Sequence, residues 1–336
     1  MGLTRYLGRR VLWFVGTLVV ALLLNFFLPR LIPGNPVDAI ISNLSRGGGV
    51  GGEQLQDIYE NYSREFGLDK PVWEQFLVYL DQLVHGNLGT SFAQYPASVN
   101  SLIGQSLPWS IVLQVPAILI GWIVGNVLGA VAAFRGGWFD LGAFVTSLFA
   151  TSVPYYCLAI LLLFVVGVQL GVLPIGGAYS FGLTPEPTLA FFGDAITYFW
   201  LPFWSLVVVF VGGQAVGMRS MAIYELGADY VNYGRGLGLS DNRITRYVFR
   251  NAMLPQVTGL ALSISGLVGG ALVTELVFSY PGIGTLLFTA IGQVDYPVIS
   301  AITLIITVAV LLANLAVDVV NGFVDPRIRA VQSGER

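Results

Sequence analysis

Charged side chains are scarce in this sequence. Only 10% of its 336 residues are charged, whereas 55% are hydrophobic, and the mean hydropathy is +0.75. A soluble domain usually carries about a quarter charged residues, so this chain has too few ionised side chains to cover a water-facing surface. The sequence therefore predicts an integral membrane protein.

Three residue types that often build reactive sites occur once each. The single cysteine, Cys157, excludes an intrachain disulfide and a thiolate zinc cluster. The single histidine, His85, excludes a multi-histidine metal site and disfavours a Ser-His dyad, so we expect neither a metal site nor a catalytic residue. The single lysine, Lys70, follows Leu68-Asp69 and not the glycine of a G-x-x-x-x-G-K-[ST] loop, which excludes a Walker-type ATPase site on this chain. Basic residues form no stripe outside the membrane flanks, which disfavours nucleic-acid binding.

Six apolar runs are long enough to cross a bilayer, since a spanning helix needs about 20 residues. We place them at residues 11–29, 108–134, 141–168, 198–217, 257–278 and 298–320. The first run follows Arg5, Arg9 and Arg10 but lacks a small-residue cleavage pattern, so we expect a retained signal anchor. The fold class is therefore all-α with six transmembrane helices.

The positions of the arginines predict the orientation. Twelve of the sixteen basic residues fall at the amino terminus, in the second-to-third and fourth-to-fifth connections, or in the tail. The short connections 169–197 and 279–297 have none. Because cytoplasmic loops are enriched in Lys and Arg, we expect a multi-pass protein of the cell membrane with both termini cytoplasmic.

The long loop 30–106 is the main candidate for structure outside the bilayer. A glycine-rich stretch, 47–52, is typical of a flexible tip or linker. Asp69-Lys70-Pro71 predicts a helix start. After it, one apolar stripe recurs at four-residue spacing, at Val72, Phe76, Leu80 and Val84. We expect this helix to lie on the outer membrane surface or to pack over the ends of the spans.

Residues 218–256 form a predicted cytoplasmic connection of unusual composition. Leu226, Tyr230, Tyr233 and Leu237 fit one stripe of a helix, which Gly236 and Gly238 then interrupt. Ser240 can cap a second helix, in which Ile244, Tyr247, Val248 and Leu254 share one face and Arg243, Arg246 and Arg250 another, and Pro255 closes the segment. The spacing allows two interpretations: a docking site for a partner, or an interfacial helix whose arginines contact anionic lipid.

A few residues within the runs are candidates for a pathway or gate. Glu275 and Asp318 are carboxylates within predicted spans, where ionised groups are costly, and structural pairing near a span end is the competing interpretation. Pro154 gives either a kink or a hinge, with polar Ser152 and Tyr156 beside it. Four-residue spacing of glycines predicts close helix packing at Gly121, Gly125 and Gly129.

At this point the sequence resembles a known family, the ABC importer permeases of the dipeptide, oligopeptide and nickel class. The central motif is the EAA-type loop, which matches Tyr230-Val231, Gly234-Arg235-Gly236-Leu237-Gly238-Leu239-Ser240 and Arg250-Asn251-Ala252-Met253-Leu254-Pro255. Further motifs match in order along nearly the whole chain: Arg9-Arg10, residues 31–36, 66–71, 86–91 and 152–154, Leu173-Pro174, Glu275, residues 278–284, Asp295-Tyr296-Pro297 and residues 325–329. Two departures occur in the loop: residues 232–234 do not read Glu-Ala-Ala, and Gly238 lies seventeen residues before Pro255, about one helical turn more than in the sugar-importer version.

The resemblance implies a type I ABC importer permease with a MetI-like core, preceded by an extra amino-terminal span and a long external loop. It implies a second homologous permease, two ABC ATPase subunits that bind the ATP and magnesium, and an external substrate-binding protein. This chain itself would hold no cofactor. The ATPase-coupling residues would be Tyr230, Gly234, Arg235, Leu237, Gly238, Leu239 and Pro255, with Leu237 or Leu239 as an apolar knob. The pathway or gate would include Ser152, Pro154, Tyr156, Glu275, Pro281 and Gly282.

The sequence thus predicts a transport subunit, not an enzyme, that forms half of the pathway for a peptide or similar small polar solute, with a nickel complex or an oligosaccharide as other cargoes. The alternatives are a stand-alone ion-coupled transporter or channel, and a membrane-embedded enzyme such as a protease. The predicted divisions are an amino-terminal segment and first span (1–34), an external loop with amphipathic helices (35–96), a transmembrane core (97–322) containing the coupling loop (218–256), and a cytoplasmic tail (323–336).

Overall fold

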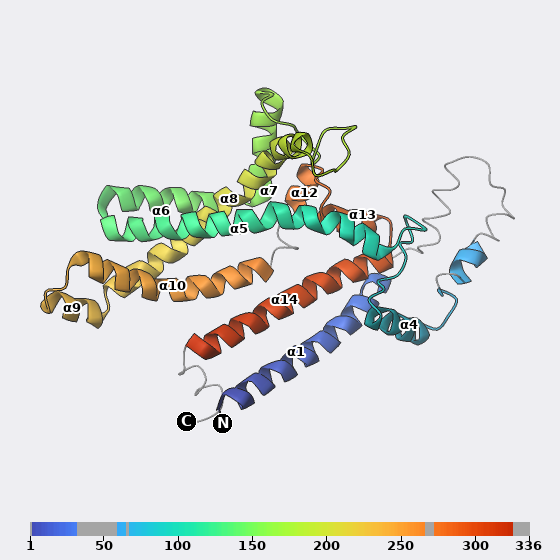
Figure 1. Ribbon diagram of the computed structural model, residues 1–336, viewed down its shortest axis with the longest axis horizontal. Helices are drawn as coiled ribbons and strands as arrows, with labels where there is room; N and C mark the ends of the chain where they lie inside the picture. The colour runs from blue at the N-terminus through green and yellow to red at the C-terminus, as the bar shows by residue number, and fades with distance from the viewer. Residues whose placement is uncertain (1, 32–58, 65–66, 266–271, 325–336) are drawn as a thin grey trace. The chain divides into compact units, whose positions relative to one another are not determined.

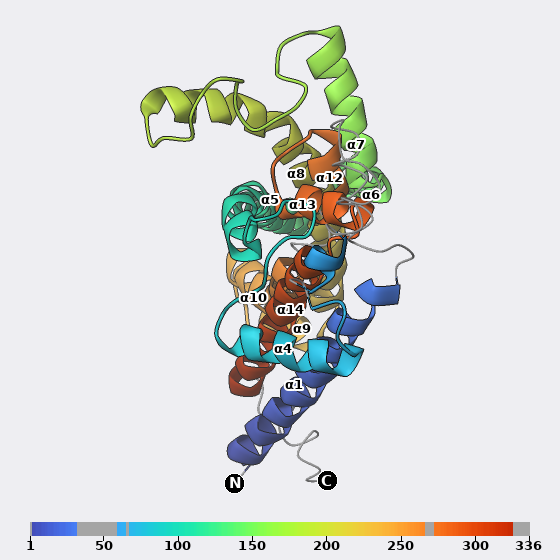
Figure 2. The ribbon, with the colours of Figure 1, turned by 90° about the vertical axis from the view of Figure 1, so that its right-hand side faces the viewer.

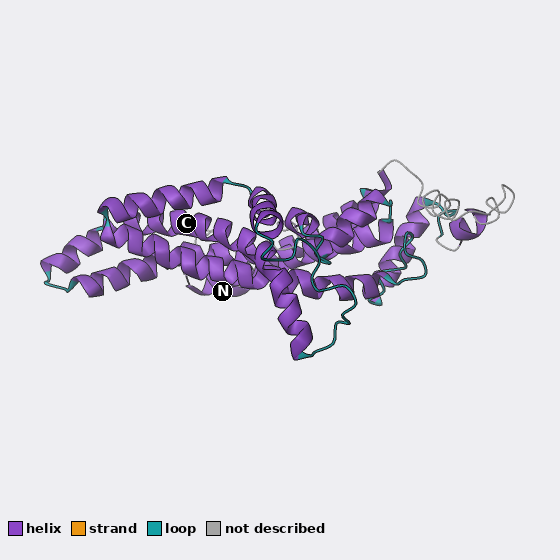
Figure 3. Cartoon of the chain, turned by 90° about the horizontal axis from the view of Figure 1, so that it is seen from above, coloured by secondary structure: helices purple, strands orange, loops and turns teal. Residues whose placement is uncertain are grey.

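The structure is a computed structural model that describes residues 2–31, 59–64, 67–265 and 272–324. Helices make up most of this part of the chain (Figure 3), and the described residues contain no strand beyond one isolated bridge between Thr90 and Ser98. The glycine-rich stretch 47–52 and the tail from residue 325 lie outside the described residues. The helical fold class is confirmed.

The helices follow one another along the chain as labelled in Figure 1. Their bounds are α1 Gly2–Phe27, η1 Pro29–Leu31, α4 Val72–Val84, α5 Val99–Arg135, α6 Gly137–Ser152, α7 Tyr155–Leu162, the π-helix η2 Leu163–Gln169, α8 Leu189–Leu226, α9 Asp229–Gly236, α10 Asp241–Ser265, α12 Leu272–Val277, α13 Ile283–Gly292 and α14 Tyr296–Val324. They form two compact units, with residues 1–108 and 282–336 in unit 1 and residues 109–281 in unit 2.

Four of the predicted spans coincide with helices that are long and apolar enough to cross a membrane. These are Gly8–Leu31, Val99–Arg135, Leu189–Leu226 and Tyr296–Ala316. The helices around the second and fourth predicted spans have 37 and 38 residues, or about 55 Å each at 1.5 Å per residue, which exceeds a hydrocarbon core of about 30 Å. Hydropathy located the apolar part of each helix, but the helices continue into more polar sequence.

The third predicted span is not one straight helix. α6 ends at Ser152, Val153 is extended, and α7 begins after Pro154, so that the helix pair is bent by 91°. Proline disfavours a helical conformation in the residue before it, which accounts for the break at Val153. Pro154 therefore marks a sharp turn of the chain and not a slight kink.

The fifth predicted span, 257–278, begins within α10 and ends just past α12, and its middle, 266–271, lies outside the described residues. With the bent pair counted as one span, the described residues supply five candidates. The fifth predicted span, and with it the total of six, stays a prediction.

In unit 1, α1 runs along α14, and α13 packs against α14 (Figure 1). The rings of Phe76 and Tyr79 on α4 lie 5.0 and 5.4 Å from the ring of Phe26 near the end of α1. The predicted helix of the long loop therefore packs over the end of the first span. The predicted stripe is wrong at its two ends, because Val72 and Val84 are exposed while the packed face of α4 centres on Phe76 and Tyr79.

In unit 2, α8 is the central helix, against which α6, α7 and α10 pack. It contains Pro202, and its yellow-green start is turned away from the rest of the helix in Figure 2. The glycines of α5 meet α8 closely: a Cβ atom at Gly121 would lie 2.5 Å from Cβ of Phe210, and one at Gly125 would lie 2.7 Å from the carbonyl oxygen of Val211. The predicted role of these glycines in close helix packing is confirmed.

The close contact at Gly125 predicts how a substitution there changes the stability of the protein. We expect Gly125→Ala to lower the free energy of unfolding by about 1–3 kcal/mol, because the new methyl group overpacks the interface with α8. The matched control is Gly142→Ala on an exposed position of α6, where no atom lies within 4 Å of the new Cβ; it should be neutral or stabilising by up to about 1 kcal/mol. Unfolding in detergent, followed by tryptophan fluorescence, measures both. Equal stability of the two variants would contradict the packing of α5 on α8.

Candidate functional site

A short hairpin of helices at the end of α8 is the first candidate site. α8 stops at Leu226, and Gly227 and Ala228 separate it from the eight-residue helix α9. At the other end of α9, the amide of Leu239 donates to the carbonyl of Gly234, and Gly238 takes a φ of +74°. α10 then begins at Asp241. We call residues 218–256 the α9 segment.

One face of α9 is buried against α10. Val231 is 1% exposed and packs in a cluster with Ile244 and Val248 of α10. Leu239 packs against the same cluster, and Gly234 is buried where an added Cβ would lie 3.3 Å from Leu239. Because Gly234 has no side chain, α9 can lie close to the chain that follows it.

The predicted stripe of Leu226, Tyr230, Tyr233 and Leu237 is wrong. The break at Gly227 places Leu226 on another helix and resets the helical phase, so the buried face of α9 carries Val231 instead. Tyr233 and Leu237 are 71% and 64% exposed. The predicted basic face is confirmed, because Arg243, Arg246 and Arg250 are all exposed.

Pro255 also departs from its predicted role. It does not close the segment, because it lies inside α10, which runs on to Ser265. A proline removes its own backbone donor but leaves the turns on both sides able to form. α10 therefore connects the α9 segment directly to the start of the fifth predicted span.

A polar contact fastens α9 to its neighbours. The hydroxyl of Tyr230 donates a 2.6 Å hydrogen bond to Glu225 near the end of α8, and the side-chain amide of Asn251 on α10 donates to the same carboxylate oxygen at 3.4 Å. Burial, together with the hydrogen bond to Glu225, raises the pKa of Tyr230. The sequence reasoning missed Glu225, because nothing in the spacing distinguishes it from Asp229, the other carboxylate shortly before Tyr230.

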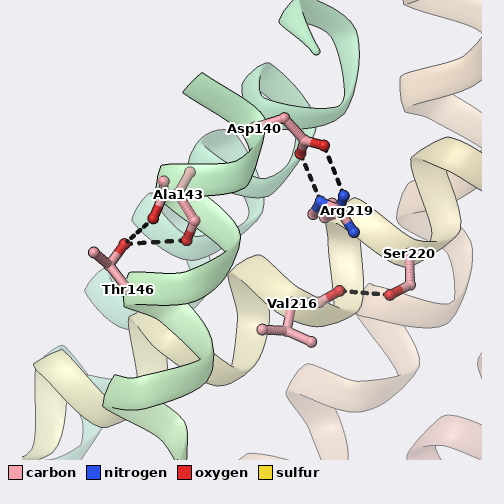
Figure 4. A network of polar contacts seen from close by, with 7 residues as sticks. Asp140, Ala143, Thr146, Val216, Arg219 and Ser220 are labelled. Atoms are coloured by element: carbon pink, nitrogen blue, oxygen red, sulfur yellow. Dashed lines mark hydrogen bonds and ion pairs between the residues drawn. The ribbon is translucent and has the colours of Figure 1, made fainter. Parts of the chain in front are cut away.

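An ion pair fixes α8 against α6 (Figure 4). The guanidinium of Arg219 donates to both carboxylate oxygens of Asp140, from Nε at 2.5 Å and from Nη2 at 2.6 Å, and lies 4.4 Å over the ring of Phe144. Paired arginine and carboxylate groups in this forked geometry hold their positions well. Arg219, expected in a loop, therefore lies in the body of α8 and anchors the helix that leads into the α9 segment.

The second candidate site surrounds Glu275. This residue lies in α12 with no exposed surface. Its Oε1 accepts a 2.6 Å hydrogen bond from the Ser110 hydroxyl and a 3.3 Å bond from the Gln114 amide, both on α5. Ser110 and Gln114 were not predicted, and their separation of more than 160 residues from Glu275 leaves no local signal.

The other predicted gate residues occupy breaks in the chain. Ser152 donates to the carbonyl of Leu148 within α6, Pro154 precedes α7, and Tyr156 is exposed. α7 packs against α12, the helix of Glu275. Pro281 is the last residue of unit 2, and Gly282, the residue before α13, begins the second stretch of chain that belongs to unit 1. The side chain of Asp318 lies outside the described residues, although its backbone belongs to α14.

Two short motifs of unit 1 meet in the fold. The buried carboxylate of Asp295 accepts hydrogen bonds from the Ser91 hydroxyl at 2.5 Å and from the amides of Phe92 and Ala93 at 3.1 and 3.2 Å. These contacts bind the loop before α5 to the turn between α13 and α14. Among the residues that the structure describes, no group of three or more His, Cys, Asp or Glu could hold a metal ion.

Comparison with known proteins supplies the deciding observation. The family model for binding-protein-dependent transport system inner membrane components matches residues 125–330. The chain belongs to this family. The match covers the α9 segment and Glu275, whereas Ser110 and Gln114 lie before the matched residues.

Curated relatives match the permease over its whole length. A putative peptide permease of Brucella ovis is 34% identical, covering 97% of this chain and 99% of its own. A dipeptide transport system permease of Lactococcus lactis is 31% identical over 97% of this chain and all of its own. An oligopeptide transport system permease of Bacillus subtilis is 31% identical over 96% and 98%. The similarity therefore extends beyond residues 125–330 to nearly the whole chain.

Proposed function

We propose that this chain forms half of the transmembrane pathway of an ATP-binding-cassette importer for a peptide or similar small polar solute. The peptide is proposed because the Lactococcus and Bacillus relatives are named as dipeptide and oligopeptide permeases. The observation that carries the coupling role is the geometry of α9, which is packed on one face and leaves Tyr233 and Leu237 exposed on the segment. A rigid helix with outward apolar side chains is suited to a groove on a partner.

The partners would be a second homologous permease, two ATPase subunits and an external substrate-binding protein. ATP and magnesium would bind to the ATPase subunits. α9 would lie in a groove of one ATPase subunit and carry its closure into the long helices α8 and α10. The contacts of Tyr230 and Arg219 support this, since they tie α9 to α8 and α8 to α6.

The pathway would open and close by alternating access. Transport pathways are often lined by discontinuous helices. The breaks in the helices at Pro154 and at Pro281-Gly282 therefore support these positions as moving parts of the pathway. Glu275 would border the outer gate, held by Ser110 and Gln114. The proposed topology has six spans and cytoplasmic termini in the cell membrane, with the divisions 1–34, 35–96, 97–322 and 323–336.

Uptake by reconstituted protein tests this function. Vesicles that contain this chain, the second permease, both ATPase subunits and the binding protein should accumulate a labelled dipeptide only when ATP is supplied on the ATPase side. Vesicles with this chain alone should accumulate none. ATP-independent uptake by the single chain would instead support the stand-alone transporter.

A further inference from the structure

A cavity of about 290 Å³ in unit 1 gathers cations that are far apart in the sequence. Arg30 after α1, Arg64, and Lys70 before α4 all line it. They are three of the four basic residues of the loop 30–106. The described residues that line the cavity include no Asp or Glu, although Arg64 pairs with Glu60 outside the lining at 3.4 Å. The volume is near the lower end of the range for small-molecule sites, about 300–1,000 Å³.

Arg30 is held in place by neutral groups. Its Nη1 donates to the carbonyl of Phe26 at 2.7 Å, and its Nε and Nη2 donate to Oε1 of Gln75 at 3.4 and 3.3 Å. Its guanidinium also lies 3.5 Å over the ring of Phe26. Among the described residues no carboxylate pairs with this half-buried charge. Because burying a charge without a counter-ion is costly, the arrangement favours an anionic ligand.

Gln75 and Tyr79 provide further polar groups at the cavity that suit an anionic ligand. The amide of Gln75 donates to the backbone carbonyl of Lys70 at 2.9 Å, so one side chain contacts both the Arg30 guanidinium and the backbone of Lys70. The hydroxyl of Tyr79, whose residue lines the cavity, is buried and has no hydrogen-bond partner among the described residues. Guanidinium, ammonium and hydroxyl donors together suit the oxygens of a phosphate group.

Part of the cavity lining is apolar, although Gln82, Asn87 and Thr90 also line it. Val78 and Phe92 line it beside the cations. Leu28 and Leu31, on either side of Arg30 at the end of the first span, expose about half or more of their surface. A ligand with a phosphate and a hydrocarbon part fits both features. We propose that this cavity binds the phosphate group of an anionic phospholipid.

Lipid retention by the purified full chain tests the proposal. Native mass spectrometry in detergent, with phosphatidylglycerol added, should show bound lipid on the unmodified chain. The retained fraction should fall at least ten-fold in Arg30→Gln and at least three-fold in Lys70→Gln. It should be unchanged in Arg135→Gln, an exposed arginine at the end of α5 in the other unit. Lys70 is exposed, so its variant keeps the test valid if Arg30→Gln does not fold.

A second arm separates the two sources of phosphate. Equilibrium dialysis with radioactive inorganic phosphate at millimolar concentration should show no binding that depends on Arg30. Phosphate binding that is lost in Arg30→Gln, without retention of phosphatidylglycerol, would overturn the lipid as the source. Equal retention of phosphatidylglycerol by the unmodified chain, Arg30→Gln and Lys70→Gln would overturn the site altogether.

Discussion

Replacing Leu237 by aspartate is expected to reduce ATP-driven uptake at least about 100-fold, which corresponds to about 2.7 kcal/mol. Leu237 is mostly exposed on the α9 segment, so the change should leave the chain folded. In the proposed complex the side chain enters an apolar groove of the ATPase, where a buried carboxylate without a partner is costly. Uptake of labelled dipeptide by the reconstituted importer measures the effect, and thermal unfolding measures the fold.

Two further variants, one at position 237 and one at position 239, control this result. Leu237→Met keeps an apolar side chain of similar volume and should retain most of the uptake. Leu239→Asp should lower stability, because Leu239 packs with Val231, Ile244 and Val248. Of the two residues predicted as an apolar knob, Leu237 is exposed and Leu239 is packed. Uptake that survives Leu237→Asp in a folded chain would show that this side chain is not part of the coupling.

The second large effect is expected at Asp295. Replacement by leucine should destabilise unit 1 by about 3–5 kcal/mol, because it leaves the hydroxyl of Ser91 and the amides of Phe92 and Ala93 without their common acceptor. Hydrogen exchange of the amides at residues 91–93 should rise before the whole chain unfolds. Thermal unfolding in detergent and exchange followed by mass spectrometry measure the two quantities.

An exposed carboxylate on α4 provides the matched control. Asp81 lies at the surface, where Nδ1 of the His85 imidazole is 3.7 Å from its carboxylate. Asp81→Asn should therefore change the stability by no more than about 0.5 kcal/mol. If Asp295→Leu is as stable as Asp81→Asn, the loop before α5 is not held by the carboxylate.

Hydropathy alone predicted four of the spans, because a bilayer demands long apolar helices and leaves a strong signal in the sequence. It could not predict the 91° bend at Pro154. Apolar side chains continue on both sides of the bend, and hydropathy does not depend on the direction of the chain. The proline itself was the only signal, and it was interpreted as either a kink or a hinge within one continuous span.

The sequence predicted where the α9 segment lies in the chain, but not which of its side chains are buried. Helical spacing was counted through Gly227, where the structure has a break, so the wrong face of α9 was expected to be apolar. Gly236 and Gly238 gave the correct end of the helix, and the arginine spacing gave the correct exposed face of α10. Counting across the break at Gly227 therefore failed. Within α10 the apolar face was predicted only in part, because Ile244 and Val248 are buried while Tyr247 and Leu254 are exposed.

Contacts between distant residues were beyond the sequence. Glu275 was chosen because a carboxylate within a span needs an explanation, but Ser110 and Gln114, its partners, have no spacing that points to it. The same holds for Ser91 and Asp295, which lie 204 residues apart. Resemblance to the family placed both in short motifs, and only the fold brings those motifs together.

Cross-linking from position 237 tests the coupling role most directly. Cys157 is the only cysteine and Lys70 the only lysine, so Leu237→Cys in a Cys157→Ser background offers a single thiol. A reagent that joins this thiol to amines would then capture almost only lysines of partner subunits. We expect the assembled importer to give a product with the mass of this chain plus one ATPase subunit. Phe181→Cys, an exposed position in the predicted external connection, should give none. An ATPase product from position 181 and none from 237 would contradict the coupling role of α9.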